Sequence, residues 1–420
     1  MGDWQAGELL RIATAGSVDD GKSTLIGRLL YDSKSVFTDQ MDAIERTSAD
    51  RGDDYTNLAL LTDGLRAERE QGITIDVAYR YFATPRRTFI VADTPGHVQY
   101  TRNMVTGAST ADVAIVLVDA RKGVIEQSHR HAYLASLLCV PHIVLAVNKM
   151  DLVDYQQSVF DAIAADFQTF VASLGRSAVL AVPMAALQGD NVVERSTAMP
   201  WYDGPALLEL LEDIELTRDH NRTDARFPVQ YVIRPMSTER PDYRGYAGVV
   251  SSGVFRPGDA VTVLPSGRET IVEGIDCYDQ QLDAAFAPLS VTLRLVHDVD
   301  VSRGDMIVAS DDVPTVAHEL TADVCWMVDA PLRAGSRYSI KHTTRSIKAM
   351  VTTIEYRVDT TSLEQVETDQ LTLNDIGRVS FRLAAPLFVD DYAHNRATGS
   401  FIVIDEATKS TVGAGMIRIA

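Results

Sequence analysis

The residues with the clearest chemical potential are Gly16, Gly21, Lys22 and Ser23, which follow the spacing G-x4-G-K-[ST]. Backbone N–H groups of such a turn can hold phosphate oxygens, and glycines permit the close approach because they have no Cβ. Lys22 is expected to reach the β- and γ-phosphates of a nucleotide, and the Ser23 hydroxyl to coordinate Mg²⁺. The alternative is an ordinary glycine turn, but an apolar strand precedes the motif and a helical pattern follows it. The predicted phosphate-binding residues are Gly16, Ser17, Val18, Asp19, Asp20, Gly21, Lys22, Ser23 and Thr24.

A second motif, Asp93-Thr94-Pro95-Gly96-His97, follows a short apolar run. Asp93 is expected to hold Mg²⁺ through water, and the Gly96 N–H to donate to the γ-phosphate and so to sense its presence. His97 could orient the attacking water, whereas a lone histidine is more often structural. We favour the catalytic role, because His97 adjoins the motif that contacts the γ-phosphate.

A third motif, Asn148-Lys149-Met150-Asp151, predicts which base is bound. An aspartate carboxylate accepts two hydrogen bonds from guanine N1–H and N2–H₂, and adenine cannot donate in that pattern. Asp151 therefore favours GTP and GDP over ATP. Asn148 is expected to tie this loop to the phosphate loop, and the Lys149 stem to lie over the base.

Two weaker signals complete the predicted site. The loop Ala185-Ala186-Leu187 is expected to present a backbone N–H, that of Ala186, to the guanine O6. Thr74 lies in the stretch G-I-T-I-D after a long polar segment; it could reach Mg²⁺ and the γ-phosphate, or be a plain strand threonine. The predicted catalytic residues are His97, Lys22 and Thr74, and the predicted metal ligands are Ser23, Thr74 and Asp93.

These motifs need a sheet to position them, and the first half of the chain predicts one. Continuous apolar runs at 87–96, 111–120 and 141–151 end in polar residues, which is typical of buried parallel strands with chemistry at their carboxyl ends. Segments 128–140 and 159–174 between them have helical spacing. The pattern predicts a doubly wound α/β P-loop GTPase domain with a mostly parallel sheet.

The second half of the chain changes character near residue 221. Short alternating strands, separated by glycine and proline, form two successive units that we expect to be β-barrels. The predicted domains are residues 1–223, 224–312 and 313–420.

Composition limits the partners and the compartment. The net charge of -19 and a pI of about 4.8 disfavour general nucleic-acid binding, because such a surface repels phosphate backbones. Cys139, Cys277 and Cys325 are odd in number and lack CxxC spacing, so neither a disulfide framework nor a zinc site is expected and a reducing cytoplasm fits best. No signal-peptide pattern and no long apolar run is present, so we expect no membrane association.

The three motifs in this order, followed by two predicted barrels, resemble the translation-factor GTPases such as elongation factor Tu. Several stretches resemble more closely the GTPase subunits of bacterial sulfate adenylyltransferase. These stretches are 25–34, 93–112, 116–138, 200–212, 226–235 and 397–405. Ala185 departs from that family, which usually has serine there. Because this loop contacts guanine through its backbone, we expect weaker loop support rather than lost specificity.

The resemblance implies GTP/GDP and Mg²⁺ as cofactors, and a heterodimer with a small adenylyltransferase subunit. That partner joins ATP and sulfate into adenylyl sulfate and pyrophosphate, an uphill step that GTP hydrolysis drives. The sequence contains neither an SGG-type pyrophosphatase loop nor an H-x-G-H motif, which places the sulfate chemistry on the partner. It contains no second G-x4-G-K-[ST], so we expect no adenylyl-sulfate kinase activity in this chain.

The competing hypothesis is an elongation-factor-like GTPase that carries aminoacyl-tRNA. The acidic composition argues against it, although Lys341, His342, Arg345 and Lys348 could form a small basic patch in the last barrel. A solvated strand face is the preferred interpretation of those four residues. A selenocysteine-type factor is a third possibility, for which an extra C-terminal domain is missing.

Overall fold

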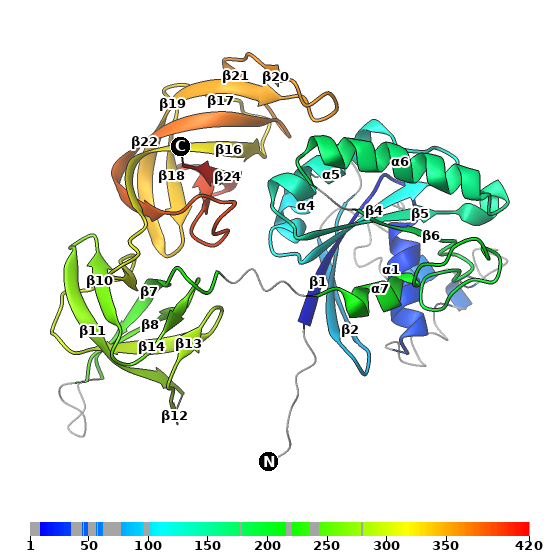
Figure 1. Cartoon of the computed structure of the whole chain (residues 1–420). Coiled ribbons are helices and arrows are strands. Elements are labelled where there is room, and N and C mark those ends of the chain that lie inside the picture. The colour runs from blue at the N-terminus through cyan, green and yellow to red at the C-terminus, as the bar shows by residue number, and fades with distance from the viewer. Residues whose placement is uncertain are drawn as a thin grey trace. The chain divides into compact units, whose positions relative to one another are not determined.

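The computed structural model describes residues 9–34, 44, 46–48, 56, 58–61, 77–95, 101–176, 179–215, 221–235, 243–278 and 280–419. The chain forms two compact units (Figure 1). One consists of residues 1–217 with 360–362, and the other of residues 218–359 with 363–420.

A six-stranded sheet forms the centre of the first unit, in the order β2-β3-β1-β4-β5-β6. Only β2 is antiparallel to its neighbour; the other five strands are parallel. All seven residues of β4 are buried, as expected for a strand covered on both faces. The strands are β1 (Leu9–Ala15), β2 (Ala78–Ala83), β3 (Thr88–Asp93), β4 (Val113–Asp119), β5 (His142–Asn148) and β6 (Leu180–Pro183).

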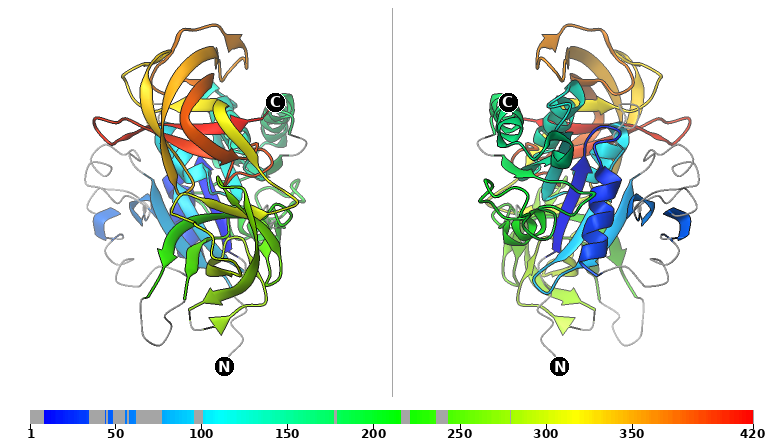
Figure 2. Two further views of the ribbon diagram at one scale, coloured as in Figure 1. Left: turned by 90° about the vertical axis from the view of Figure 1, so that its left-hand side faces the viewer. Right: turned by 90° about the vertical axis from the view of Figure 1, so that its right-hand side faces the viewer.

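Helices cover both faces of this sheet (Figure 1). On one face lie α1 and α7, and on the other α4, α5 and α6. The second view in Figure 2 shows α1 lying along the sheet beside β1, where Leu25 and Leu29 join Leu10 in one buried core. The doubly wound, mostly parallel fold is therefore confirmed. The helices are α1 (Lys22–Asp32), α4 (Thr101–Ala108), α5 (Glu126–Leu137), α6 (Gln157–Ser173) and α7 (Leu207–Asp213), with 3₁₀ turns η1 (Leu58–Leu61) and η3 (Met150–Val153).

The second unit contains two antiparallel barrels, which confirms that prediction. The first closes because β10 pairs with β11 as well as with β15. Its strands are β7 (Arg226–Ile233), β8 (Gly245–Val249), β9 (Val254–Phe255), β10 (Ala260–Leu264), β11 (Arg268–Cys277), β12 (Gln280–Gln281), β13 (Ala285–Phe286), β14 (Ser290–Leu295) and β15 (Met306–Ala309).

The second barrel closes in the same way, because β18 pairs with both β23 and β19. Its strands are β16 (Thr315–Trp326), β17 (Leu332–Arg333), β18 (Arg337–His342), β19 (Arg345–Val358), β20 (Gln365–Val366), β21 (Gln370–Leu371), β22 (Ile376–Val389), β23 (Ser400–Ile404) and β24 (Thr411–Arg418). Each barrel has its own buried core.

The predicted domain boundaries fall between regular elements. The boundary at 223/224 lies between α7 and β7, and the boundary at 312/313 between β15 and β16. Both barrels nevertheless belong to one compact unit. The division into residues 1–223, 224–312 and 313–420 therefore stays a prediction.

The two barrels are joined through a buried arginine. Arg226, on the first strand of the first barrel, is 2% exposed. Its Nε and Nη2 donate to Asp390 of the second barrel at 3.1 and 3.0 Å. Its Nη1 donates to the Asp312 carboxylate at 3.1 Å. Beside this network Leu264 and Met306 share a small apolar cluster with Phe388, so charge and apolar packing act together at the junction.

Candidate nucleotide site

The sheet brings the carboxyl ends of four strands to one edge. Thr14 of β1 is in register with Asp93 of β3, and Asp119 of β4 is in register with Asn148 of β5. Because parallel strands all end at the same edge, the loops that follow them converge there. Two of the three motifs begin at these strand ends, and the phosphate loop directly follows β1.

The phosphate loop has a backbone that its sequence explains. Gly21 lies in the left-handed region with φ 94°, and a Cβ there would collide with the side chain of Asn148. The Ser17 N–H donates to Asp20 Oδ2 at 2.6 Å, which fixes the turn from within. Burial raises the pKa of the Asp20 carboxyl, and this hydrogen bond opposes the rise. The loop is therefore shaped by its own side chains before the helix begins.

Lys22 lies inside this loop. The residue is 7% exposed, and its Nζ donates to the carbonyl oxygens of Gly16 at 2.7 Å and Ser17 at 2.9 Å. Burial lowers the pKa of Lys22, while the negative charge of Asp93 opposes the change. An ammonium group held in this position can neutralise phosphate oxygens bound to the loop amides.

Oxygen atoms suited to Mg²⁺ lie beside the lysine. Asp93 is 1% exposed at the end of β3, and its negative charge opposes the lowering of the Lys22 pKa that burial causes. Ser23 is half-buried in the first turn of α1. Among the described residues, no group of three or more His, Cys, Asp and Glu side chains could hold a metal ion by itself. One carboxylate and one hydroxyl fit a magnesium ion that takes its other ligands from phosphates and water.

Thr94 and Pro95, which follow Asp93, are buried. The Thr94 hydroxyl donates to the Thr14 carbonyl at 2.5 Å. This bond anchors the second motif to β1, directly before the phosphate loop. The positions of these two residues favour a supporting role in the site.

Asn148 connects the phosphate loop to the two later loops. Its Nδ2 donates to the Asp20 carbonyl at 2.8 Å, and its Oδ1 accepts the Ala186 N–H at 2.9 Å. The side chain is 2% exposed, so both bonds are shielded from water. We predicted that the Ala186 N–H faces the guanine O6; in the structure this N–H donates to Asn148 Oδ1.

The loop 185–187 has a further support that the sequence did not reveal. Arg28 of α1 donates from Nε to the Ala186 carbonyl at 3.3 Å and from Nη2 to the Leu187 carbonyl at 2.6 Å. Ala185 itself is fully buried. Two side-chain contacts to the backbone therefore hold this loop, although alanine stands where serine was expected.

The comparisons with known proteins identify a GTP-binding domain in the part of the chain that carries these motifs. The model of the elongation factor Tu GTP binding domain matches residues 7–217, and that of the GTP-eEF1A C-terminal domain-like family matches residues 319–418. A Bacteroides fragilis protein named sulfate adenylyltransferase subunit 1 is 52% identical over 412 residues, covering 98% of this chain and 86% of that protein. The chain belongs to the family of sulfate adenylyltransferase subunit 1.

One further relative supports this membership of the sulfate adenylyltransferase subunit 1 family, and one solved structure shares the fold. The bifunctional enzyme CysN/CysC of Mycobacterium tuberculosis is 59% identical over 411 residues, covering 97% of this chain and 67% of that enzyme. The S. cerevisiae Ski7 GTPase-like domain, solved with GDP and inorganic phosphate, superimposes with a TM-score of 0.54. At 16% identity, over 99% of this chain and 98% of that one, it shows a shared fold.

Family membership establishes a guanine-nucleotide-binding domain of the elongation factor Tu type. The family name also denotes one subunit of an assembly, which implies a partner subunit. No helix in the described part of the chain is long and apolar enough to cross a membrane.

Three predicted residues of the sulfate adenylyltransferase subunit 1 site lie outside the described residues. They are Thr74, Gly96 and His97. Their predicted contacts with Mg²⁺, the γ-phosphate and the attacking water stay predictions.

The structure also reveals a residue that the sequence analysis missed. Asp119 ends β4 and is 1% exposed, and its Oδ2 lies 3.1 Å from Lys149 Nζ. The available signal was the one used for Asp93 and Asn148: a polar residue at the carboxyl end of a buried strand. Met150 of the base-reading motif is fully buried, whereas Asp151 is half-buried in η3.

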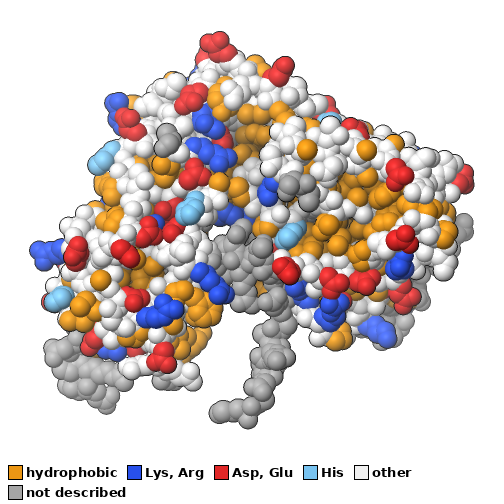
Figure 3. Space-filling model, in the orientation of Figure 1, with side chains coloured by type: hydrophobic (Ala, Val, Ile, Leu, Met, Phe, Trp, Pro, Cys, Tyr) orange, Lys and Arg blue, Asp and Glu red, His pale blue; other side chains and the backbone are white. Residues whose placement is uncertain are grey.

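The four residues of the possible basic patch do not share one exposed surface: Lys341 and Lys348 are exposed, whereas His342 is buried and Arg345 is half-buried. His342 is 1% exposed, and its Nε2 is 2.8 Å from the Thr398 carbonyl. The Arg345 guanidinium lies over the Phe388 ring and 3.7 Å from Asp305. Arg345 therefore contacts the first barrel, and His342 is buried within the second barrel. On the face shown in Figure 3, acidic and basic side chains are interspersed.

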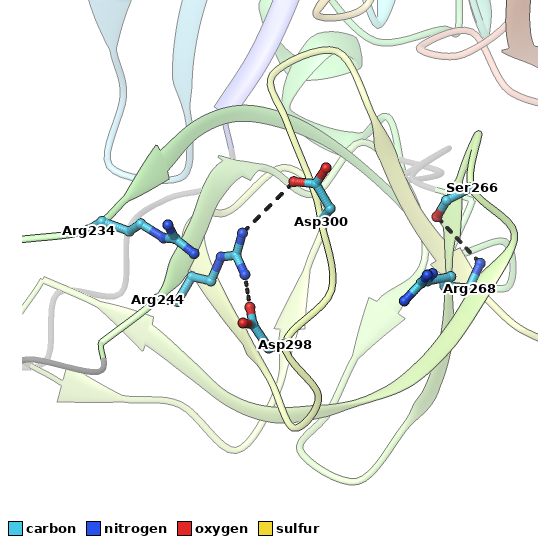
Figure 4. Close-up of a pocket in the computed structure, with 6 residues that line it drawn as sticks. All are labelled: Arg234, Arg244, Ser266, Arg268, Asp298 and Asp300. Atoms are coloured by element: carbon cyan, nitrogen blue, oxygen red, sulfur yellow. Dashed lines mark hydrogen bonds and ion pairs between the residues drawn. The ribbon is translucent and has the colours of Figure 1, made fainter.

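A separate polar cavity of about 540 Å³ lies in the first barrel, away from the motifs in sequence. Three arginines and two aspartates face it (Figure 4). Arg244 forms ion pairs with Asp298 and Asp300, and its guanidinium lies 5.9 Å from the centre of the Tyr246 ring. The lining residues are Arg234, Arg244, Ser266, Arg268, Asp298 and Asp300.

Proposed function

We propose that this chain is the GTPase subunit of a sulfate adenylyltransferase. It hydrolyses GTP, and this reaction drives a small partner subunit to form adenylyl sulfate and pyrophosphate from ATP and sulfate. One observation carries the proposal: Asn148 joins the phosphate loop to the loop 185–187 in a chain 52% identical to a protein named sulfate adenylyltransferase subunit 1.

The phosphate end of the site would work through groups already close together. Loop amides and Lys22 would hold the β- and γ-phosphates, and Ser23 and Asp93 would hold Mg²⁺, which would neutralise phosphate charge. Thr74 and the Gly96 N–H would close over the γ-phosphate, and His97 would orient the attacking water. Hydrolysis would release the closed segments, and the partner would sense their release.

The base end would select guanine through Asp151. Replacing Asp151 by Asn should shift the preference from GTP toward xanthosine triphosphate, because the amide reverses one hydrogen-bond donor and acceptor pair. Competition binding with the two nucleotides measures this preference. An unchanged preference for GTP would remove Asp151 from the base-reading role.

The proposed assembly is a heterodimer with the small adenylyltransferase subunit, located in the cytoplasm. None of the three cysteines, all of which are described, forms a disulfide, which fits a reducing compartment. We also propose that residues 1–223, 224–312 and 313–420 are the three domains that transmit the nucleotide state to the partner.

The decisive experiment measures GTP hydrolysis by the purified chain with and without the small subunit, ATP and sulfate. We expect GTP hydrolysis to accelerate when all three are present. We also expect adenylyl sulfate to accumulate above the equilibrium level that it reaches when GTP is absent. Lys22→Ala should abolish hydrolysis, because it removes the cation from the phosphate loop. Full turnover by this variant, or no coupling to adenylyl sulfate synthesis, would refute the proposal.

Delivery of aminoacyl-tRNA is not favoured. His342 and Arg345 are committed to packing within the second unit, which leaves Lys341 and Lys348 as the exposed members of the possible patch. Binding of aminoacyl-tRNA at physiological salt, measured by filter retention, would reverse this judgement.

A further inference from the structure

Asp119 is a buried carboxylate that contacts two cations of the candidate nucleotide site. It lies at the end of β4, in register with Asn148, the first residue of the base-reading motif. Its side chain is fully buried, whereas the Lys149 and Arg121 side chains are 23% and 47% exposed. A buried charge with two more exposed partners fixes the positions of those partners.

The geometry of the Lys149 contact links three parts of the site. Lys149 Nζ lies 3.1 Å from Asp119 Oδ2 and also donates to the Asp19 carbonyl in the phosphate loop. The lysine ammonium is therefore held between β4 and the phosphate loop. Lys149 stands two residues before Asp151 in the base-reading motif.

Arg121 is held by the same carboxylate in a bidentate pair. Its Nε donates to Asp119 Oδ1 at 3.0 Å and its Nη2 to Oδ2 at 2.6 Å. The Arg121 backbone N–H adds a third bond to Oδ1 at 3.0 Å. The hydrogen bond to Asp119 and the charge of that carboxylate raise the pKa of Arg121, with a smaller contribution from the negative charge of Asp151.

We propose that Asp119 is a positioning residue for the guanine nucleotide, which sets its affinity by holding Lys149 and Arg121 without contacting the nucleotide itself. The inference rests on the proposed function, because it concerns the same site. Burial would raise the pKa of Asp119, but the hydrogen bonds from Arg121 and Lys149 outweigh it and keep the pKa low. The carboxylate is thus charged wherever the protein is folded near neutral pH.

The prediction is that loss of this charge loosens nucleotide binding more than it slows hydrolysis. Asp119→Asn keeps the size of the side chain but removes its charge and one acceptor oxygen. We expect GDP dissociation, followed with a fluorescent GDP analogue on the full chain, to accelerate by about 10- to 100-fold, the range for a lost charged hydrogen bond. The KM for GTP should rise while kcat stays within about threefold, since Asp119 lies at the base side of the site.

A double-mutant cycle separates positioning from general stabilisation. If Asp119 acts through Lys149, the effect of Asp119→Asn on GDP dissociation should be smaller in a Lys149→Met background than in the wild type. An equal effect in both backgrounds would overturn the inference. Arg121→Gln, which leaves the buried carboxylate in place, should also accelerate dissociation, and it keeps the test valid if Asp119→Asn folds poorly.

Asp112→Asn is the matched control. Asp112 precedes the same strand at its opposite end, where its Oδ2 accepts the Arg11 N–H at 2.8 Å. GDP dissociation from this variant should stay within about twofold of the wild type, because Asp112 lies at the opposite end of β4 from the base-reading motif. If the wild type binds GDP and Asp119→Asn binds it equally tightly, this inference alone fails; if the wild type binds no GDP, the proposed function fails.

Discussion

At the level of single residues, the site depends on polar side chains that hold its loops in place. Asn148 joins the phosphate loop to the loop 185–187, and Arg28 joins that second loop to α1. Such contacts are worth most where water is excluded, because an unmet donor or acceptor there has no replacement partner. Nucleotide affinity is therefore a property of these connections as well as of the groups that touch the ligand.

Arg28 gives a direct test of this view. Arg28→Ala removes both hydrogen bonds to the Ala186 and Leu187 carbonyls and should weaken GDP binding by about 1 kcal/mol, or about fivefold. Isothermal titration of the purified chain measures the change. Arg195→Ala is the matched control, because Arg195 also donates to a backbone carbonyl, that of Tyr202, without contacting the loop 185–187. Equal losses in the two variants would contradict the role of Arg28.

His131 makes the stability of the nucleotide-binding unit depend on pH. Burial lowers the pKa of His131 from 6.5 to about 3, and the nearby charge of Lys22 adds to the effect. As the pH falls below 6.5, His131 therefore takes up a proton in the unfolded chain but not in the folded one. Its contribution to stability is complete above pH 6.5 and is lost as the pH falls toward 3. In this interval we expect the free energy of unfolding to fall by about 1.4 kcal/mol per pH unit because of this residue.

Urea unfolding of the wild type and of His131→Gln at about pH 7.5 and about pH 5.5 checks this dependence. The variant should lose less stability between the two values than the wild type does. The exposed His318 supplies the control, since His318→Gln should leave the pH dependence unchanged. A wild-type slope in His131→Gln would show that other groups carry the dependence.

At the level of elements, the sequence predicted the strands that are both buried and followed by a functional motif. The apolar runs that became β3, β4 and β5 were visible because parallel strands covered on both faces contain few polar residues. Asn148 and Asp93 could be predicted because their roles fix their residue types. Arg28 could not, since its partners are backbone carbonyls distant in sequence, which leave no sequence pattern. Asp119 was missed although it ends a buried strand, as Asp93 and Asn148 do.

Side chains also fasten the ends of strands in the first barrel. Arg244 precedes β8, whereas its partners Asp298 and Asp300 lie between β14 and β15 (Figure 4). Both aspartates are largely exposed, so each ion pair alone contributes little. The stacking of Arg244 on Tyr246 adds an attraction that solvent screens less.

Arg244→Ala should therefore lower the free energy of unfolding by about 1 kcal/mol, from the combined loss of ion pairs and ring contact. Arg268→Ala is the control within the same cavity, because Arg268 is exposed and has no acidic partner among the described residues. Its effect should stay within about 0.5 kcal/mol. Equal effects in chemical denaturation would show that Arg244 is an ordinary surface arginine.

At the level of the whole molecule, the sequence predicted the classes of the parts better than their connections. Two barrels could be predicted from two sets of alternating strands, but the contact between them could not. From the sequence, no role was predicted for the Arg226 side chain, and His342 was considered only as a member of a possible basic patch. In the structure both are buried, and at the junction Asp390 accepts hydrogen bonds from Arg226 and from the Thr398 hydroxyl.

This junction should make the two barrels unfold together. Asp390 is only 8% exposed, and Arg226→Ala removes the main partner of its carboxylate. Breaking a buried ion pair in this way lowers stability by about 3–5 kcal/mol. Either the whole second unit loses that stability or its single unfolding transition separates into two, one for each barrel. Differential scanning calorimetry distinguishes both outcomes from an unchanged protein. Arg382→Ala is the control, because it breaks an exposed ion pair with Glu319 and should lower the free energy of unfolding by less than about 1 kcal/mol. A larger loss of stability in this control, or no loss in Arg226→Ala, would show that burial of the ion pair does not govern the coupling.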